Sequence, residues 1–141
     1  MPTTSSPTSP ASRDPSTWVL VAAGALGLLG VAAGAFGAHG LESRIDAEQL
    51  EWWATGARYQ QIHAAALLVV GWGAGPWTRA RSFAALGFVV GSLIFAGTLY
   101  AMALGGPRVL GAITPLGGLG LMAGWVGVAA HAWAVRSSNS G

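Results

Sequence analysis

The chain has 141 residues, of which 52% are hydrophobic and only 9% are charged, and its formal net charge is +2. Typical soluble domains carry about 25% charged residues, so this composition excludes an ordinary water-facing surface and favours lipid as the outer solvent. The small, scattered charge gives no basis for a nucleic-acid partner, and the absence of cysteine excludes disulfides and thiol metal sites.

Residues 1–17 are rich in Pro, Ser and Thr. Such a segment cannot bury enough apolar surface to offset the entropy of ordering, so we predict a disordered polar tail. A secretory signal is the competing interpretation, with Ala33-Gly34-Ala35 as its cleavage site. However, the tail carries no net positive charge, and the apolar run that follows is longer than a usual signal core. Both features favour a retained helix.

Residues 18–38 form the first predicted membrane span. They contain no charge and no proline, and about 20 apolar residues are enough to cross the hydrocarbon core of a bilayer. Glycines recur in steps of three and four, which places most of them on one helix face. Since small residues let membrane helices approach closely, we predict that Gly30, Gly34 and Gly37 pack against another helix.

Residues 41–58 are the only strongly charged segment of the chain. Asp46 and Gln49 have the spacing of a capping box, and the residues after them separate into an apolar and a polar helix face. We predict a short amphipathic helix that lies on the membrane surface, with Trp52 and Trp53 at the level of the lipid headgroups.

Three further spans are predicted, at residues 59–76, 83–104 and 115–135. The apolar part of the first of these is short, so its polar beginning is expected near a membrane interface. Gly-Gly-Pro at 105–107 breaks the helix of the next one. Glycines at helical spacing again predict helix-packing positions in the last two spans. They are Gly87, Gly91, Gly120 and Gly124.

The sequence therefore predicts an all-α protein: a membrane-spanning four-helix bundle with a short amphipathic interfacial helix between spans one and two, and a second polar tail at 136–141. Four spans place both termini on one side of the membrane. That side carries four arginines and the other side three, so the positive-inside rule places the termini in the cytoplasm. The expected partners are the lipid bilayer and either further copies of the chain or a larger membrane complex.

Four segments of the chain carry a family resemblance. They are GAFGAHGL at 34–41, YQQIHAAALL at 59–68, GSLIFAGTLYAMAL at 91–104 and ITPLGGLGLMAGW at 113–125. From residue 18 to residue 133 the chain resembles the domain-of-unknown-function 423 or UPF0382 family, whose animal relatives are called transmembrane protein 256. The polar tail before residue 18 departs from that pattern. The resemblance implies a multi-pass protein of the bacterial inner membrane, and it implies no mechanism.

No Asp, Glu, Lys or Arg lies inside a predicted span. Charges within spans are expensive and usually functional, so their absence argues against a carboxylate proton relay or a charge-coupled transporter. A passive pore or a carrier of neutral solutes stays possible. The chain also shows no nucleophile–base pair, so we expect no catalytic residues and no enzyme activity.

The candidate polar site is formed by His39, Tyr59, Gln60 and His63, where the first span ends and the second begins. Its functional interpretation is a pocket for a metal, a lipid headgroup or a small solute. The alternative, and the more common case, is a set of hydrogen bonds that join helices. Two histidines are too few for a zinc site, and Glu42 is not required by the spacing, so no metal or cofactor is predicted.

His131, near the end of the last span, is interpreted as an interfacial histidine that is hydrogen-bonded to a partner. Two functional hypotheses follow from the whole sequence. The first is a structural or interaction bundle of unknown molecular activity. The alternative is an oligomeric channel or carrier for a small neutral solute or a lipid.

Overall fold

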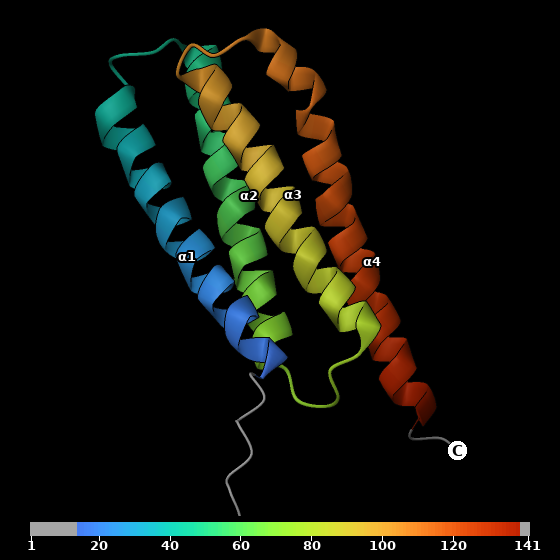
Figure 1. Cartoon of the computed structure of the whole chain (residues 1–141). Coiled ribbons are helices and arrows are strands. Elements are labelled where there is room, and N and C mark those ends of the chain that lie inside the picture. The colour runs from blue at the N-terminus through green and yellow to red at the C-terminus, as the bar shows by residue number, and fades with distance from the viewer. Residues whose placement is uncertain (1–13, 139–141) are drawn as a thin grey trace, which may run out of the picture.

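The computed structural model describes residues 14–138, which form four long helices joined by short connections (Figure 1). The helices are α1 (Pro15–Phe36), α2 (Ala47–Trp72), α3 (Arg79–Ala103) and α4 (Thr114–Ser138). A π-helical turn, η1 (Gly37–Leu41), extends α1, and a 3-10 turn, η2 (Arg108–Ala112), precedes α4. The described residues contain no strand, so the all-α prediction is confirmed.

Helices that follow one another in sequence are also neighbours in space. The main packing contacts join α1 to α2, α2 to α3 and α3 to α4, and each helix runs opposite to the one before it (Figure 1). The two ends of the helical part of the chain lie at the same end of the bundle as the α2–α3 connection. Short connections favour this up-and-down topology. Between the helices lies an apolar core that includes Leu26, Leu67, Phe88 and Leu121.

The helices extend further toward the termini than predicted. Residues 1–13 of the first predicted polar tail and residues 139–141 of the second lie outside the described residues. Helix α1 already begins at Pro15, because the Asp14 carboxylate accepts a hydrogen bond from the Ser16 backbone N–H at 2.9 Å. Helix α4 likewise continues through Arg136 to Ser138. Helix α1 therefore includes residues 15–17 of the first predicted tail, and helix α4 includes residues 136–138 of the second.

The prediction of a separate surface helix at residues 41–58 is wrong. The capping box is present: Asp46 accepts the Gln49 N–H at 2.8 Å, and the Gln49 side chain accepts the Asp46 N–H at 3.1 Å. The helix that begins there, however, continues unbroken to Trp72. Its buried positions run through both halves at steps of three and four, from Trp53 to Leu67, so one face packs along most of its length.

Three segments are long and apolar enough to cross a membrane: Ser16–Leu41, Arg79–Ala103 and Arg108–Ser137. Helix α2 is not among them, because its first half carries the charged and polar residues of the segment that was expected on the surface. Nevertheless α2 has 26 residues, about 39 Å of helix, and it packs between α1 and α3. Several of its polar side chains therefore meet other helices.

Glycines bring the backbones of α3 and α4 into direct contact. A Cβ atom placed on Gly87 would lie 2.9 Å from the Gly120 carbonyl oxygen and 2.9 Å from the Gly124 nitrogen. One placed on Gly91 would lie 2.6 Å from the Leu121 nitrogen. These distances are shorter than van der Waals contact, so a larger residue would push the helices apart. In lipid, close packing of this kind replaces the hydrophobic drive that joins helices in water.

We expect Gly91→Ala to destabilise the bundle by about 1–3 kcal/mol, because the added methyl group overpacks the α3–α4 contact. The measurement is unfolding of the purified protein in mixed micelles by SDS titration. The matched control is Gly24→Ala in α1, where a Cβ atom meets nothing within 4 Å. Equal stability of the two variants would show that the α3–α4 glycines are not required for close packing.

Candidate functional site

Polar side chains of α2 hydrogen bond to the backbone of α1. The Trp53 indole N–H donates to the Ala33 carbonyl at 2.7 Å, and the Gln61 amide donates to the Gly30 carbonyl at 2.7 Å. A helical carbonyl oxygen has a second lone pair beyond its own helix bond, and these donors use it. Hydrocarbon offers no water as an alternative partner, so these bonds hold α2 against α1.

The glycines of α1 make this approach possible. A Cβ atom on Gly30 would lie 2.8 Å from Gln61 Cγ, and one on Gly37 would lie 2.6 Å from Trp53 Cδ1. At Gly34 the nearest atom would be Gln61 Nε2, at 3.2 Å. The glycines predicted to pack against another helix thus face the polar and aromatic side chains of α2, whereas α3 and α4 meet backbone to backbone.

Gln60 connects α1, α2 and α3. Its side chain is only 5% exposed, and its Nε2 donates to the Leu26 carbonyl at 2.9 Å. Its Oε1 accepts a hydrogen bond from the Tyr100 hydroxyl of α3 at 3.0 Å. The Tyr100 ring packs in turn against Trp53, with ring centroids 4.5 Å apart. One buried amide therefore fixes the position of α2 against two neighbours.

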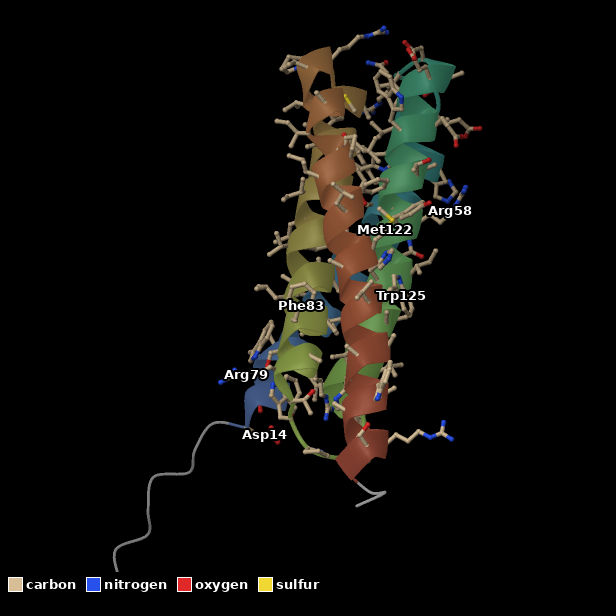
Figure 2. The ribbon with its side chains drawn as sticks, turned by 90° about the vertical axis from the view of Figure 1, so that its right-hand side faces the viewer. Asp14, Arg58, Arg79, Phe83, Met122 and Trp125 are labelled. Atoms are coloured by element: carbon tan, nitrogen blue, oxygen red, sulfur yellow. The ribbon has the colours of Figure 1, made fainter. Side chains whose placement is uncertain are left out.

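His63 lies on the other flank of α2 and joins it to α4. Its Nε2 lies 3.3 Å from Trp125 Nε1, and its Nδ1 lies 2.7 Å from the Tyr59 carbonyl oxygen. An indole nitrogen can only donate, so Nε2 must accept, and the ring proton sits on Nδ1 and is donated to Tyr59. Both ring nitrogens of a neutral imidazole are then occupied. Figure 2 shows Trp125 on the side of α4 that faces α2.

The four residues of the predicted polar site do not line one pocket. Tyr59 and His63 stack with ring centroids 6.0 Å apart and line a cavity of about 450 Å³ beside α4. Gln60 lines a different cavity, because consecutive helix positions point about 100° apart. The His39 side chain is exposed on η1 and has no hydrogen-bond partner among residues 14–138. Since α2 begins at Ala47, His63 lies beyond the middle of that helix and not at its start.

The cavity that Gln60 lines is a groove between α1 and α3, which we call the α1/α3 groove. Its volume is about 470 Å³, and its lining is mostly apolar. Two further polar side chains reach it: Tyr100, which is bonded to Gln60, and Ser92, whose hydroxyl has no hydrogen-bond partner. No group of three or more His, Asp or Glu side chains that could hold a metal occurs among residues 14–138.

Arg81 is a structural residue that the sequence did not reveal. The sequence predicts a tight turn at Arg79 and Arg81, but Arg81 lies in the first turn of α3 and is only 4% exposed. Its guanidinium donates to carbonyl oxygens at and just beyond the end of α2, including those of Val70 at 2.8 Å and Gly73 at 2.6 Å. It also lies 4.5 Å from the ring centroid of Trp77. A cation here satisfies free carbonyls and complements the helix dipole.

The end of α4 is fixed to the same region. Thr78 caps α3 by accepting the Arg81 backbone N–H at 3.2 Å, and its hydroxyl oxygen also lies 2.8 Å from His131 Nδ1. The interpretation of His131 as hydrogen-bonded to a partner is therefore confirmed. At the opposite end of the bundle, an exposed Arg108–Glu48 ion pair of 3.0 Å joins η2 to α2.

Comparison with known proteins places this helix bundle among membrane proteins. The family described as "Protein of unknown function (DUF423)" matches residues 33–118. The UPF0382 membrane protein YwdK of Bacillus subtilis is 41% identical over 101 residues, which cover 70% of this chain and 82% of YwdK. A UPF0382 membrane protein of Haemophilus influenzae is 41% identical over 106 residues, covering 73% of this chain and 83% of the relative. No solved structure matches the chain.

We expect Arg81→Gln to destabilise the bundle by roughly 2 kcal/mol or more, because the carbonyls at the end of α2 lose charged donors in a buried place. The measurement is thermal unfolding in detergent, followed by circular dichroism. Arg79→Gln is the control with the same change of charge, since Arg79 is exposed and points away from the bundle (Figure 2). Equal loss in both variants would mean that net charge matters and the carbonyl contacts do not.

Proposed function

Because this chain belongs to the DUF423 family, whose relatives are named UPF0382 membrane proteins, we propose that it acts in the membrane by binding other membrane components. The chain is a membrane-embedded helical protein. In our proposal all four helices cross the cell inner membrane, and the protein neither catalyses a reaction nor conducts solutes. Its partners are lipids, further copies of itself or neighbouring membrane proteins.

One observation carries this proposal: the polar side chains inside the bundle hold helices together. Those of Trp53, Gln60 and Gln61 join α2 to α1, and His63 joins α2 to α4. Arg81 donates to the end of α2. A conducting pathway needs polar groups that are free to replace the hydration of a solute, and these groups already have partners. The contact between α3 and α4 leaves no space for a pore between those helices.

The same pairing argues against catalysis. A catalytic site needs a nucleophile or base whose reactive atom is free and within reach of a substrate. His63 uses both ring nitrogens in bonds that join helices, and the Nδ1 of His131 bonds to Thr78. Ser92 has a free hydroxyl, but no base lines its groove. Binding is therefore the activity that this arrangement supports best.

Binding partners can reach the bundle from the side. Large apolar side chains of α4 lie exposed along its outer face, where lipid or a second copy of the chain would contact them. They are Leu116, Leu119, Met122, Val126 and Trp133. Small-residue faces, which could also join subunits, are instead largely used within the chain, as the contacts of Gly87 and Gly91 show. An oligomer would therefore form through large side chains.

For vesicles that contain the purified protein, we expect glycerol and urea to enter no faster than in protein-free vesicles, because the interior holds no free polar pathway. The measurement is the swelling rate by stopped-flow light scattering. Vesicles with a pore-forming peptide serve as the positive control. Faster swelling that is lost in His63→Asn would overturn this proposal and restore the channel hypothesis.

For topology, we expect a reporter that is active only in the cytoplasm to be active when fused after residue 141 and inactive when fused after residue 106. The reason is that four crossings put the two positions on opposite sides, and the arginine bias places the C-terminus inside. The measurement is reporter fluorescence in intact cells at matched expression. The reverse pattern would invert the orientation, and activity at both positions would contradict four crossings.

A further inference from the structure

We propose that the α1/α3 groove binds a neutral lipid, and that a carbonyl oxygen of this lipid accepts a hydrogen bond from the Ser92 hydroxyl. This inference rests on the proposed function, that the protein acts by binding membrane components, and it names the site and the chemical class of the ligand.

The groove exists because α1 and α3 both pack on α2 without packing closely on each other. Its volume of about 470 Å³ is within the range of small-molecule sites, roughly 300–1,000 Å³. Leu29 of α1 and Leu93 of α3 line it, and both side chains are more than half exposed, at 58% and 59%. The groove therefore opens sideways between two apolar helices, and its occupant comes from the lipid phase.

Ser92 is the feature that points to a ligand. Its side chain is 2% exposed, and its hydroxyl oxygen is the single buried polar side-chain atom that lacks a hydrogen-bond partner within residues 14–138. A serine in a helix can bond to a carbonyl three or four residues earlier, and Thr98 of the same helix does so, with Ile94 at 2.8 Å. The Ser92 hydroxyl makes no such bond within residues 14–138, and Ser92 is one of the residues that line the groove.

The other polar groups of the groove favour a ligand that accepts hydrogen bonds. The Tyr100 hydroxyl donates to Gln60 Oε1, and one Gln60 N–H donates to Leu26. This leaves the Ser92 O–H and the second Gln60 N–H as donors, and a carbonyl oxygen pairs with either. No Asp, Glu, Arg or His side chain lines the groove, so a charged headgroup would find no counter-charge there.

The depth of Ser92 along the bundle distinguishes a neutral lipid from a phospholipid as the ligand. Ser92 lies near the centre of the 25-residue helix α3, roughly 17–20 Å of helix from either end. At that depth a phospholipid presents only its hydrocarbon tails, because its charged headgroup stays at the surface. A lipid without a charged headgroup, such as a diacylglycerol, can bring an ester carbonyl deeper at lower cost. We therefore commit to a neutral, carbonyl-bearing lipid.

The test uses the full-length protein in phosphatidylcholine nanodiscs and two photoreactive probes with identical diazirine-bearing chains, a diacylglycerol and a phosphatidylcholine. After irradiation, mass spectrometry of peptides locates and quantifies the labelled residues. We expect the diacylglycerol probe to label groove residues of α1 and α3 saturably, and unlabelled diacylglycerol to compete. We expect the phosphatidylcholine probe to label the outer surface without saturation.

Two glycine variants test the place of binding. Gly97 lines the groove and Gly24 does not, and a Cβ atom at either position meets nothing within 4 Å. Gly97→Leu should therefore fill the groove without disturbing the fold and abolish saturable labelling. The matched variant Gly24→Leu should leave the labelling unchanged. Loss in both variants, or in neither, would overturn the assignment of the groove.

Ser92→Ala tests the chemistry. We expect the diacylglycerol concentration at half-saturation to rise about tenfold, which corresponds to roughly 1.4 kcal/mol. The thermal stability of the ligand-free protein should stay the same or increase, because the removed hydroxyl has no partner. An unchanged diacylglycerol concentration at half-saturation in Ser92→Ala would contradict the neutral-lipid proposal. Equal saturable labelling of the groove by the phosphatidylcholine probe would contradict it as well. Solute flux in the vesicle assay would instead contradict the proposed function, whatever the labelling shows.

Discussion

The structure depends on one constraint: in hydrocarbon, a polar group must find its hydrogen-bond partner inside the protein. Helix α2 carries more polar side chains than any other helix of the bundle, and it packs between α1 and α3. There Gln60 bonds to a backbone carbonyl of α1 and to Tyr100, and His63 bonds to Trp125 of α4. In this position the least apolar helix finds hydrogen-bond partners in α1, α3 and α4.

The same constraint explains two uses of glycine. Between α3 and α4, glycines such as Gly87 and Gly120 remove side chains so that the backbones touch. Between α1 and α2, Gly30 and Gly37 instead open space for the side chains of Gln61 and Trp53, whose donors reach carbonyls of α1. In the second case the missing Cβ atom exposes a hydrogen-bond acceptor, so packing and polar pairing depend on the same residues.

The hydrogen bonds within the bundle use most of its interior polar groups, and the groups without a partner are the ones that can bind a ligand. Interior donors that hold helices together are not available to a solute, and this favours binding at the lipid-facing surface over conduction. Ser92 is the exception, because its hydroxyl is buried, unpaired and next to an apolar groove that opens sideways. A buried hydroxyl without a hydrogen-bond partner, beside an apolar groove, is suited to selecting lipids by their polar groups.

Local patterns in the sequence determined the all-helical class, the three strongly apolar helices, the capping box at Asp46 and the glycine positions of close approach, because each depends on residues within a few helical turns. Only the tertiary structure decided that the charged segment continues into α2, since the same capping box can begin a surface helix or a central one. It also separated Tyr59 and His63 from Gln60, which face different neighbours across α2. The role of Arg81 was also decided by the tertiary structure. The carbonyls that it contacts lie at the end of α2 and just beyond it, and only folding brings them within reach of its side chain. Contacts between separate helices carry no short-range signal, and in this protein such contacts decide which polar groups are used and which stay free.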